Sequence, residues 1–105
     1  SILDFIYKIE FDNKKIVYTG DTRPIDLSKF AKNADYLIHE AGELDPDLAH
    51  VSAHTTPIQA AEIAKEANVK NLILIHRPNF NQELIDKIHS IFPNTLMPND
   101  LDIIE

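Results

Sequence analysis

The chain contains no cysteine and only two glycines, Gly20 and Gly42, among its 105 residues. The lack of cysteine excludes disulfide bonds and thiolate metal sites, so histidine and carboxylate side chains would have to bind any metal ion. It also favours a cytoplasmic location. Two isolated glycines do not make the glycine-rich loop of α/β phosphate-binding domains, which argues against that class of protein.

Long apolar runs and an excess of basic residues are missing as well. The longest apolar run is residues 72–75, whereas a membrane-spanning helix needs about 20 apolar residues. Ten Lys and Arg residues against 17 Asp and Glu residues give a formal net charge of −7. A free-standing nucleic-acid-binding module usually carries a basic face, so this balance argues against one. It is compatible with a cation site.

The chain opens on a predicted β-hairpin. Residues 5–10 alternate between two faces, Asp12 and Asn13 suit a turn with positive φ, and residues 16–19 return as the partner strand. The apolar run in that second strand is typical of a sheet covered on both faces. Gly20 ends the strand and leaves Asp21 at its carboxyl end, where α/β proteins usually place their chemistry.

The rest of the chain alternates between predicted helices and strands. Asp26, Thr56 and Asn81 are predicted N-caps, and Gln59 completes a capping box with Thr56. The order indicates an α/β protein with about six or seven short strands and three helices. The helices are predicted at residues 27–31, 57–67 and 82–92, and the strands at 35–40, 69–75, 95–97 and 101–104.

Polar side chains follow the predicted strands where each one ends. Asp21 follows the first of them, His39 and Glu40 end the second, and His76 follows the third, while His54 precedes a helix start. These residue types bind metals or transfer protons, and their spacing by whole structural units lets them converge on one edge of the sheet. For any one histidine, a structural role in the core or a solvated position on the surface is about as common as a role in metal binding or catalysis. We interpret His39 as mainly structural.

Four motifs in sequence order carry a resemblance to a known family. They are Tyr-Thr-Gly-Asp-Thr at 18–22, Leu-Ile-His-Glu-Ala-Gly at 37–42, His-Thr-Thr at 54–56 and Ile-His at 75–76. The chain thereby resembles the carboxyl-terminal half of the metallo-β-lactamase fold, in its ribonuclease Z-like branch. Gly42 stands where that family has threonine, and Arg77-Pro78 departs from the residues usual after the last histidine, so the substrate stays open.

The resemblance implies a role for each matching residue. Asp21 would bridge two zinc ions, and His76 would complete the ligands of the second. His54 would stabilise the charge that develops on phosphorus or protonate the leaving oxygen, and Glu40 would orient His54 or a ligand histidine. The family's His-x-His-x-Asp-His motif lies upstream of Gly-Asp-Thr, and the twenty residues before Asp21 contain no histidine.

Residues 1–105 are therefore predicted to be half of an αββα sandwich, without the amino-terminal half that carries the missing motif. The resemblance implies that the parent protein is a zinc-dependent phosphodiesterase that processes the 3′ ends of tRNA. We expect this chain alone to be inactive and to bind zinc weakly or not at all. Half a sandwich should also expose an apolar sheet face, and such a face would drive self-association.

Two other functions stay open from the sequence. One is a general metallo-β-lactamase-fold hydrolase that acts on small phosphodiesters or other esters. The other is a non-catalytic dimerisation or binding module, although the retention of Asp21, His54 and His76 at sensible spacing argues against it.

Overall fold

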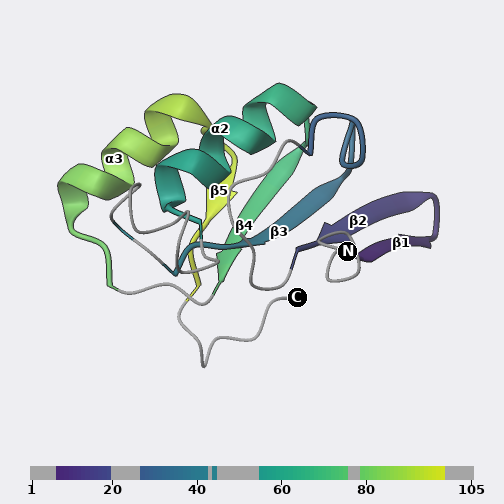
Figure 1. The fold of residues 1–105 in the computed structure, drawn as a ribbon, viewed down its shortest axis with the longest axis horizontal. Coiled ribbons are helices and arrows are strands. Elements are labelled where there is room, and N and C mark those ends of the chain that lie inside the picture. Colours follow the sequence, from purple (N-terminus) through teal and green to yellow (C-terminus); the bar gives the residue numbers. More distant parts are fainter. Residues whose placement is uncertain (1–6, 20–26, 43, 45–54, 76–78, 99–105) are drawn as a thin grey trace.

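A computed structural model describes residues 7–19, 27–42, 44, 55–75 and 79–98 of the chain. Within these residues one mixed sheet has the strand order β1-β2-β3-β4-β5 (Figure 1). Only the β1–β2 pair is antiparallel, and the other three pairs are parallel. The strands are β1 at Tyr7–Phe11, β2 at Lys14–Tyr18, β3 at Tyr36–Glu40, β4 at Asn71–Ile75 and β5 at Thr95–Leu96.

The hairpin between β1 and β2 closes through a two-residue turn, as the sequence predicts. Asp12 and Asn13 have φ values of 50° and 62°. Positive φ at both central positions gives a turn whose twist matches that of the two strands. The turn fixes the register that places Ile9 opposite Ile16.

Helix α2 (Pro57–Ala67) has the predicted bounds because its ends are encoded locally. The Thr56 hydroxyl accepts the Gln59 backbone N–H at 3.1 Å, and the Gln59 side chain accepts the Thr56 N–H at 2.9 Å. These two bonds satisfy backbone groups that the first helical turn leaves without partners. Asn68 ends the helix in the left-handed conformation, with φ of 57°.

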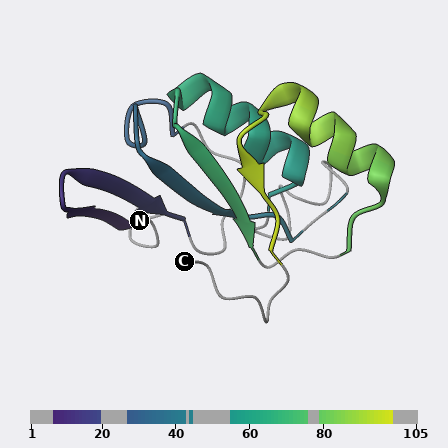
Figure 2. The same ribbon diagram turned by 180° about the vertical axis from the view of Figure 1, so that it is seen from behind.

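Helix α3 (Gln82–Ile91) and α2 both cover the same face of the sheet (Figures 1 and 2). The core lies in this layer, because alternate residues of each strand point to the helices. α2 presents small side chains that let it approach the sheet closely, and all of them are buried. The central core residues are Val17, Leu37, Leu72 and Leu74 from the strands and Ala60, Ala61, Ala64 and Ala67 from α2.

The other face of the sheet is also apolar. The register aligns Tyr18, Ile38, Ile73 and Leu96 in one row across four strands. Ile73 is buried, whereas Leu96 at the end of the row is 55% exposed. A sheet with two apolar faces is typical of a layered α/β domain.

The predicted helix at residues 27–31 is wrong. Residues 28–33 form successive turns, in which the Ala31 N–H donates to the Leu27 carbonyl at 2.8 Å and Asn33 adopts a positive φ of 59°. Five residues close one helical turn but do not offset the cost of helix nucleation. The described residues thus contain two helices and five strands, and the predicted strand at 101–104 lies outside them. None of the described helices is long and apolar enough to cross a membrane.

The capping box predicts a specific loss of stability. We expect Thr56→Ala to lower the free energy of unfolding by about 1 kcal/mol, because the Gln59 N–H loses its acceptor. Thr56→Ser keeps the hydroxyl and should retain most of that stability. Urea unfolding of the two variants measures the difference, and equal losses in both would contradict a role for the hydroxyl.

Candidate metal and catalytic site

The carboxyl ends of β2, β3 and β4 meet at one edge of the sheet, which we call the carboxyl edge. These strands are parallel, and Glu40 at the end of β3 pairs in register with Ile75 at the end of β4. Two further hydrogen bonds continue the pairing beyond the strands: the Thr19 N–H donates to Ile38 and the Ala41 N–H donates to Ile75, both at 3.0 Å. The last described residues of β2, β3 and β4 and Thr19 therefore lie beside one another at this edge.

The predicted ligands Asp21 and His76 and the predicted catalytic His54 lie outside the described residues. The structure describes their neighbours in the chain, and it places Thr19 and Ile75 at the carboxyl edge. Among the described residues no group of three or more His, Cys, Asp or Glu could hold a metal ion. The three residues thus remain predictions, and Glu40 is the predicted site residue whose surroundings are described.

Glu40 is fully buried and bonded to the backbone through both carboxylate oxygens. Oε1 accepts the Thr55 N–H at 2.5 Å, and Oε2 accepts the Gly42 N–H at 2.7 Å. A buried carboxylate needs such donors, because losing water without replacement would cost several kcal/mol. Glu40 therefore fixes the end of β3 against the residue that follows His54, at the entry to α2.

His39 is buried in the core layer beside Glu40. Its Nδ1 lies 2.8 Å from the Glu40 carbonyl oxygen, so the protonated Nδ1 donates to that oxygen. Its Nε2 has no hydrogen-bond partner among the described residues. Burial lowers the pKa of His39 to about 4, and its hydrogen bond to Glu40 only partly opposes this shift. His39 is therefore a neutral core residue at pH 7.

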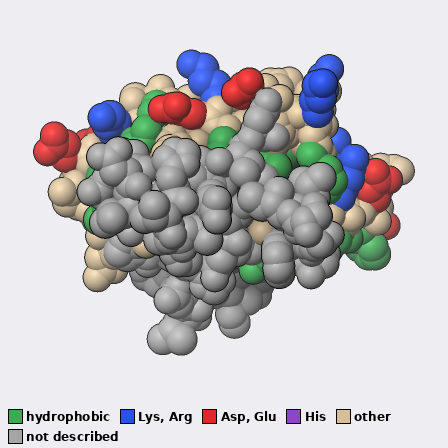
Figure 3. Space-filling model, in the orientation of Figure 1, with side chains coloured by type: hydrophobic (Ala, Val, Ile, Leu, Met, Phe, Trp, Pro, Cys, Tyr) green, Lys and Arg blue, Asp and Glu red, His purple; other side chains and the backbone are tan. Residues whose placement is uncertain are grey.

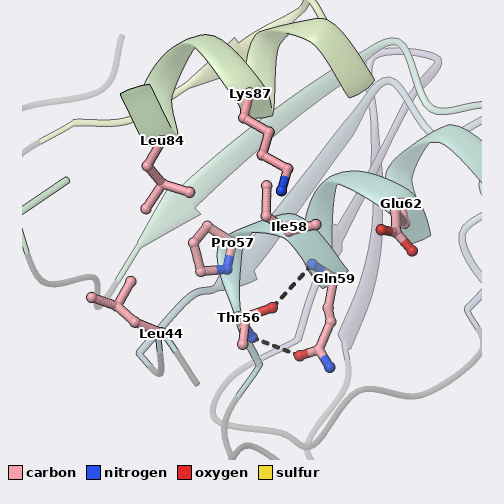
Figure 4. Close-up of a pocket in the computed structure, with 8 residues that line it drawn as sticks. All are labelled: Leu44, Thr56, Pro57, Ile58, Gln59, Glu62, Leu84 and Lys87. Atoms are coloured by element: carbon pink, nitrogen blue, oxygen red, sulfur yellow. Dashed lines mark hydrogen bonds between the residues drawn. The ribbon is translucent and has the colours of Figure 1, made fainter. Parts of the chain in front are cut away.

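A surface cavity of about 460 Å³ lies at the amino end of α2, between α2 and α3 (Figure 4). Leu44, Pro57 and Leu84 line it with apolar surface, and Lys87 extends across it from α3. Among the described residues that line it, Glu62 is the one carboxylate and none is a histidine. Glu40, the predicted site residue whose surroundings are described, is not among the residues that line this cavity.

The backbone donors of the Glu40 carboxylate are a feature that the sequence did not reveal. Gly42 lies only two residues away, and a local bond from a carboxylate to such an N–H is a familiar turn pattern. Thr55 is 15 residues away, so only the folded chain brings it to Glu40.

Comparison with known proteins assigns the family. The sequence model of the beta-lactamase superfamily domain matches residues 5–77, which is more than half of the chain. The chain belongs to the beta-lactamase superfamily. It is 41% identical over 99 residues to ribonuclease Z of Archaeoglobus fulgidus, and 56% identical over 64 residues to ribonuclease Z of Thermococcus onnurineus. The matches cover 88% and 60% of this chain and 32% and 21% of those proteins, so the chain spans a third or less of their length.

Solved structures agree with this assignment. The metallo-beta-lactamase fold protein YhfI from Bacillus subtilis superimposes with a TM-score of 0.74 at 30% identity, over 88% of this chain and 40% of that one. The short form of human tRNase Z superimposes with a TM-score of 0.66 at 26% identity, over 93% of this chain and 35% of that one. The resemblance predicted from the four motifs is confirmed.

Burial of His39 predicts a loss of stability in acid. In the unfolded chain His39 binds a proton near pH 6.5, whereas in the folded chain it does so only near pH 4. The contribution of neutral His39 to the free energy of unfolding is therefore fully present above pH 6.5. It falls by at most about 3 kcal/mol as the pH drops to 4. His39→Asn keeps a donor for the Glu40 carbonyl but does not titrate. Urea unfolding between pH 7 and about 4 should show a shallower decline in His39→Asn, and identical slopes would contradict the prediction.

The bonds of Glu40 predict that its charge and shape both matter. Glu40→Gln replaces one acceptor oxygen with an N–H₂ group that faces a backbone N–H. We expect it to lower the free energy of unfolding by about 1–3 kcal/mol and to increase amide hydrogen exchange at Thr55 and Gly42. Gln59→Glu adds a negative charge at the nearby capping box, whereas Glu40→Gln removes one. It therefore serves as the control for a change of charge alone. Unchanged exchange at Thr55 in Glu40→Gln would be evidence against the bond.

Proposed function

We propose that this chain is the carboxyl-terminal part of a metal-dependent endoribonuclease of the ribonuclease Z type. The observation that carries the proposal is the convergence of β2, β3 and β4 at one edge, each followed by a motif residue. Consecutive Cα atoms lie about 3.8 Å apart, so chain connectivity keeps His76 beside Ile75 and Asp21 within two residues of Thr19. The family assignment and the ribonuclease Z relatives support the same reading.

The family implies a metal cofactor, and we propose that it is zinc. The donors available from this chain are one carboxylate, Asp21, and one imidazole, His76, which are ligand types that zinc accepts. A zinc site needs three or four protein ligands, so the remaining donors would come from the amino-terminal half of the fold. Two zinc ions would supply a bound hydroxide as the nucleophile and stabilise the charge on phosphorus.

We propose that His54 donates a proton to the leaving oxygen or stabilises the developing charge. Glu40 is a positioning residue in this scheme, because its carboxylate bonds the Thr55 N–H directly after His54. A buried, doubly bonded carboxylate restricts where the backbone of this loop can lie. A histidine held in this way would keep a constant distance to a scissile phosphate.

The partners follow from the sheet and from the relatives. The apolar row Tyr18, Ile38, Ile73 and Leu96 supports packing of the amino-terminal half against the sheet face opposite α2 and α3. Self-association of this chain through that face also remains a proposal. For the substrate, two of the similar proteins are named ribonuclease Z and one is named tRNase Z, and we propose precursor tRNA.

The test is His54→Ala in the full-length protein that carries this chain. We expect kcat for cleavage of a precursor tRNA to fall about 10²–10⁴-fold, as for a lost general acid, while the zinc content is unchanged. Loss of zinc would instead make His54 a ligand. Glu40→Asp, which keeps the charge but shortens the side chain, should reduce kcat through misplacement of the loop.

A matched substrate separates this function from the alternative. A small aryl phosphodiester requires the same metal centre but makes no extended RNA contact. Efficient turnover of the small ester with no cleavage of precursor tRNA would favour a general phosphodiesterase over a ribonuclease.

A further inference from the structure

Six of the eight lysines of the chain lie at or beside the edge where β2, β3 and β4 begin. Because these strands are parallel, this edge is opposite the carboxyl edge. A five-residue strand spans roughly 17 Å, which separates the two edges. We call this set the basic edge, and its members are Lys14, Lys15, Lys29, Lys32, Lys65 and Lys70.

Contacts around Asp35 fix the centre of the basic edge. The Lys15 ammonium donates to the Lys32 carbonyl at 2.6 Å, and Lys70 forms an ion pair with Asp35 at 3.1 Å. The backbone N–H of Lys15 donates to the same carboxylate at 2.8 Å. This N–H, together with Lys70, lowers the pKa of Asp35. The lysines from three separate segments are thus held close together although their charges repel.

A second set of bonds attaches the end of α2 to this edge. The Asn33 N–H donates to the Ala67 carbonyl at 2.9 Å, and the Asn68 side chain donates to the Asn33 side chain at 2.9 Å. Lys65, in the last turn of α2, therefore lies beside the turns that carry Lys29 and Lys32. In Figure 3 blue side chains lie at this end of the molecule with red ones beside them, and other blue side chains lie towards the opposite end.

The local charge differs in sign from that of the whole chain. The carboxylates on the same segments are Glu10, Asp12, Asp35 and Glu66, so six lysines against four carboxylates leave the basic edge at +2. With a net charge of −7 for the chain, the remainder carries −9. A polyanion is repelled by that remainder and attracted to this edge.

Phe11 adds an aromatic surface to the basic edge. It pairs in register with Lys14 at the tip of the hairpin, and its side chain is 70% exposed. Exposed aromatic rings beside lysines are the arrangement on which unpaired bases stack while phosphates contact the charges. An acidic peptide would use the lysines alone, so the ring favours a nucleic acid.

We propose that the basic edge and Phe11 bind unpaired nucleotides of the RNA substrate at a distance from the cleavage site. This inference rests on the proposed function for the identity of the polyanion. The lysines contact the phosphates and Phe11 stacks on a base, so that the RNA extends past the sheet from the carboxyl edge.

The experiment measures binding of a fluorescein-labelled RNA stem-loop by fluorescence anisotropy over a series of salt concentrations. The stem-loop has an unpaired loop but no 3′ extension, and EDTA is present, so binding is measured without cleavage. The protein is the full-length protein that carries this chain. The charge variant is Lys29→Gln/Lys32→Gln/Lys65→Gln, which avoids the lysines that bond within the fold. Phe11→Ala and Phe11→Leu test the aromatic ring, Lys87→Gln on α3 is the matched control for the charge variant, and circular dichroism checks folding.

We expect each substituted lysine of the basic edge to weaken binding about five- to eightfold at 0.1 M salt and to reduce the salt slope by about 0.7–0.9. Lys87→Gln should leave both unchanged. Phe11→Ala and Phe11→Leu should each weaken binding by about tenfold or more, because leucine cannot stack on a base.

Equal RNA affinity in the triple variant and the unaltered protein would overturn the inference, as would full binding by Phe11→Leu. Lysine-dependent binding to vesicles of anionic phospholipid, with no lysine-dependent binding to RNA, would also overturn it in favour of a membrane surface. Failure of the full-length protein to cleave precursor tRNA, with lysine-dependent RNA binding intact, would refute the proposed function and leave this contact standing.

Discussion

The buried carboxylate of Glu40 is the constraint on which the organisation of the carboxyl edge depends. It closes β3 by accepting the Gly42 N–H and attaches the start of α2 by accepting the Thr55 N–H. A charge without exposure to water is stable only when such donors surround it. The position of the loop before α2 is therefore coupled to the end of the central strand of the sheet.

The parallel arrangement of β2, β3 and β4 gives the molecule two chemically different edges. The motif residues follow the carboxyl ends, whereas the lysines gather where the strands begin. The helices cover one face of the sheet, and the apolar row lies on the other. The proposed cleavage site and the proposed RNA-binding surface would therefore lie at opposite ends of the same strands.

The sequence predicted local structure well wherever neighbouring residues determine it. Asp12 and Asn13 tolerate positive φ, Thr56 and Gln59 bond to each other, and Asn68 ends α2, so each of these features follows from a few adjacent residues. The same reasoning failed at residues 27–31, where a cap and an apolar spacing were present. That segment forms successive turns instead, because so short a helix depends on packing that the local pattern does not describe.

The net charge illustrates a second difference between sequence and structure. Counting charges argues against a nucleic-acid surface, since the total is −7. The proposed basic edge is nevertheless compatible with that total, because the fold brings Lys15, Lys32 and Lys70 together from distant segments. The net charge of a chain does not depend on where its charged residues lie, whereas the electrostatic field at its surface depends on how they are distributed.

The sequence by itself therefore determined the family, the α/β class, the capped helix, the hairpin turn and the order of the motif residues. It did so because motifs, caps and turns are short-range patterns. Only the tertiary structure decided that Glu40 bonds the backbone beside His54, that His39 is a neutral core residue, and that the lysines form one edge. These features join residues far apart in the chain, and their partners are chosen by the packing of strands and helices.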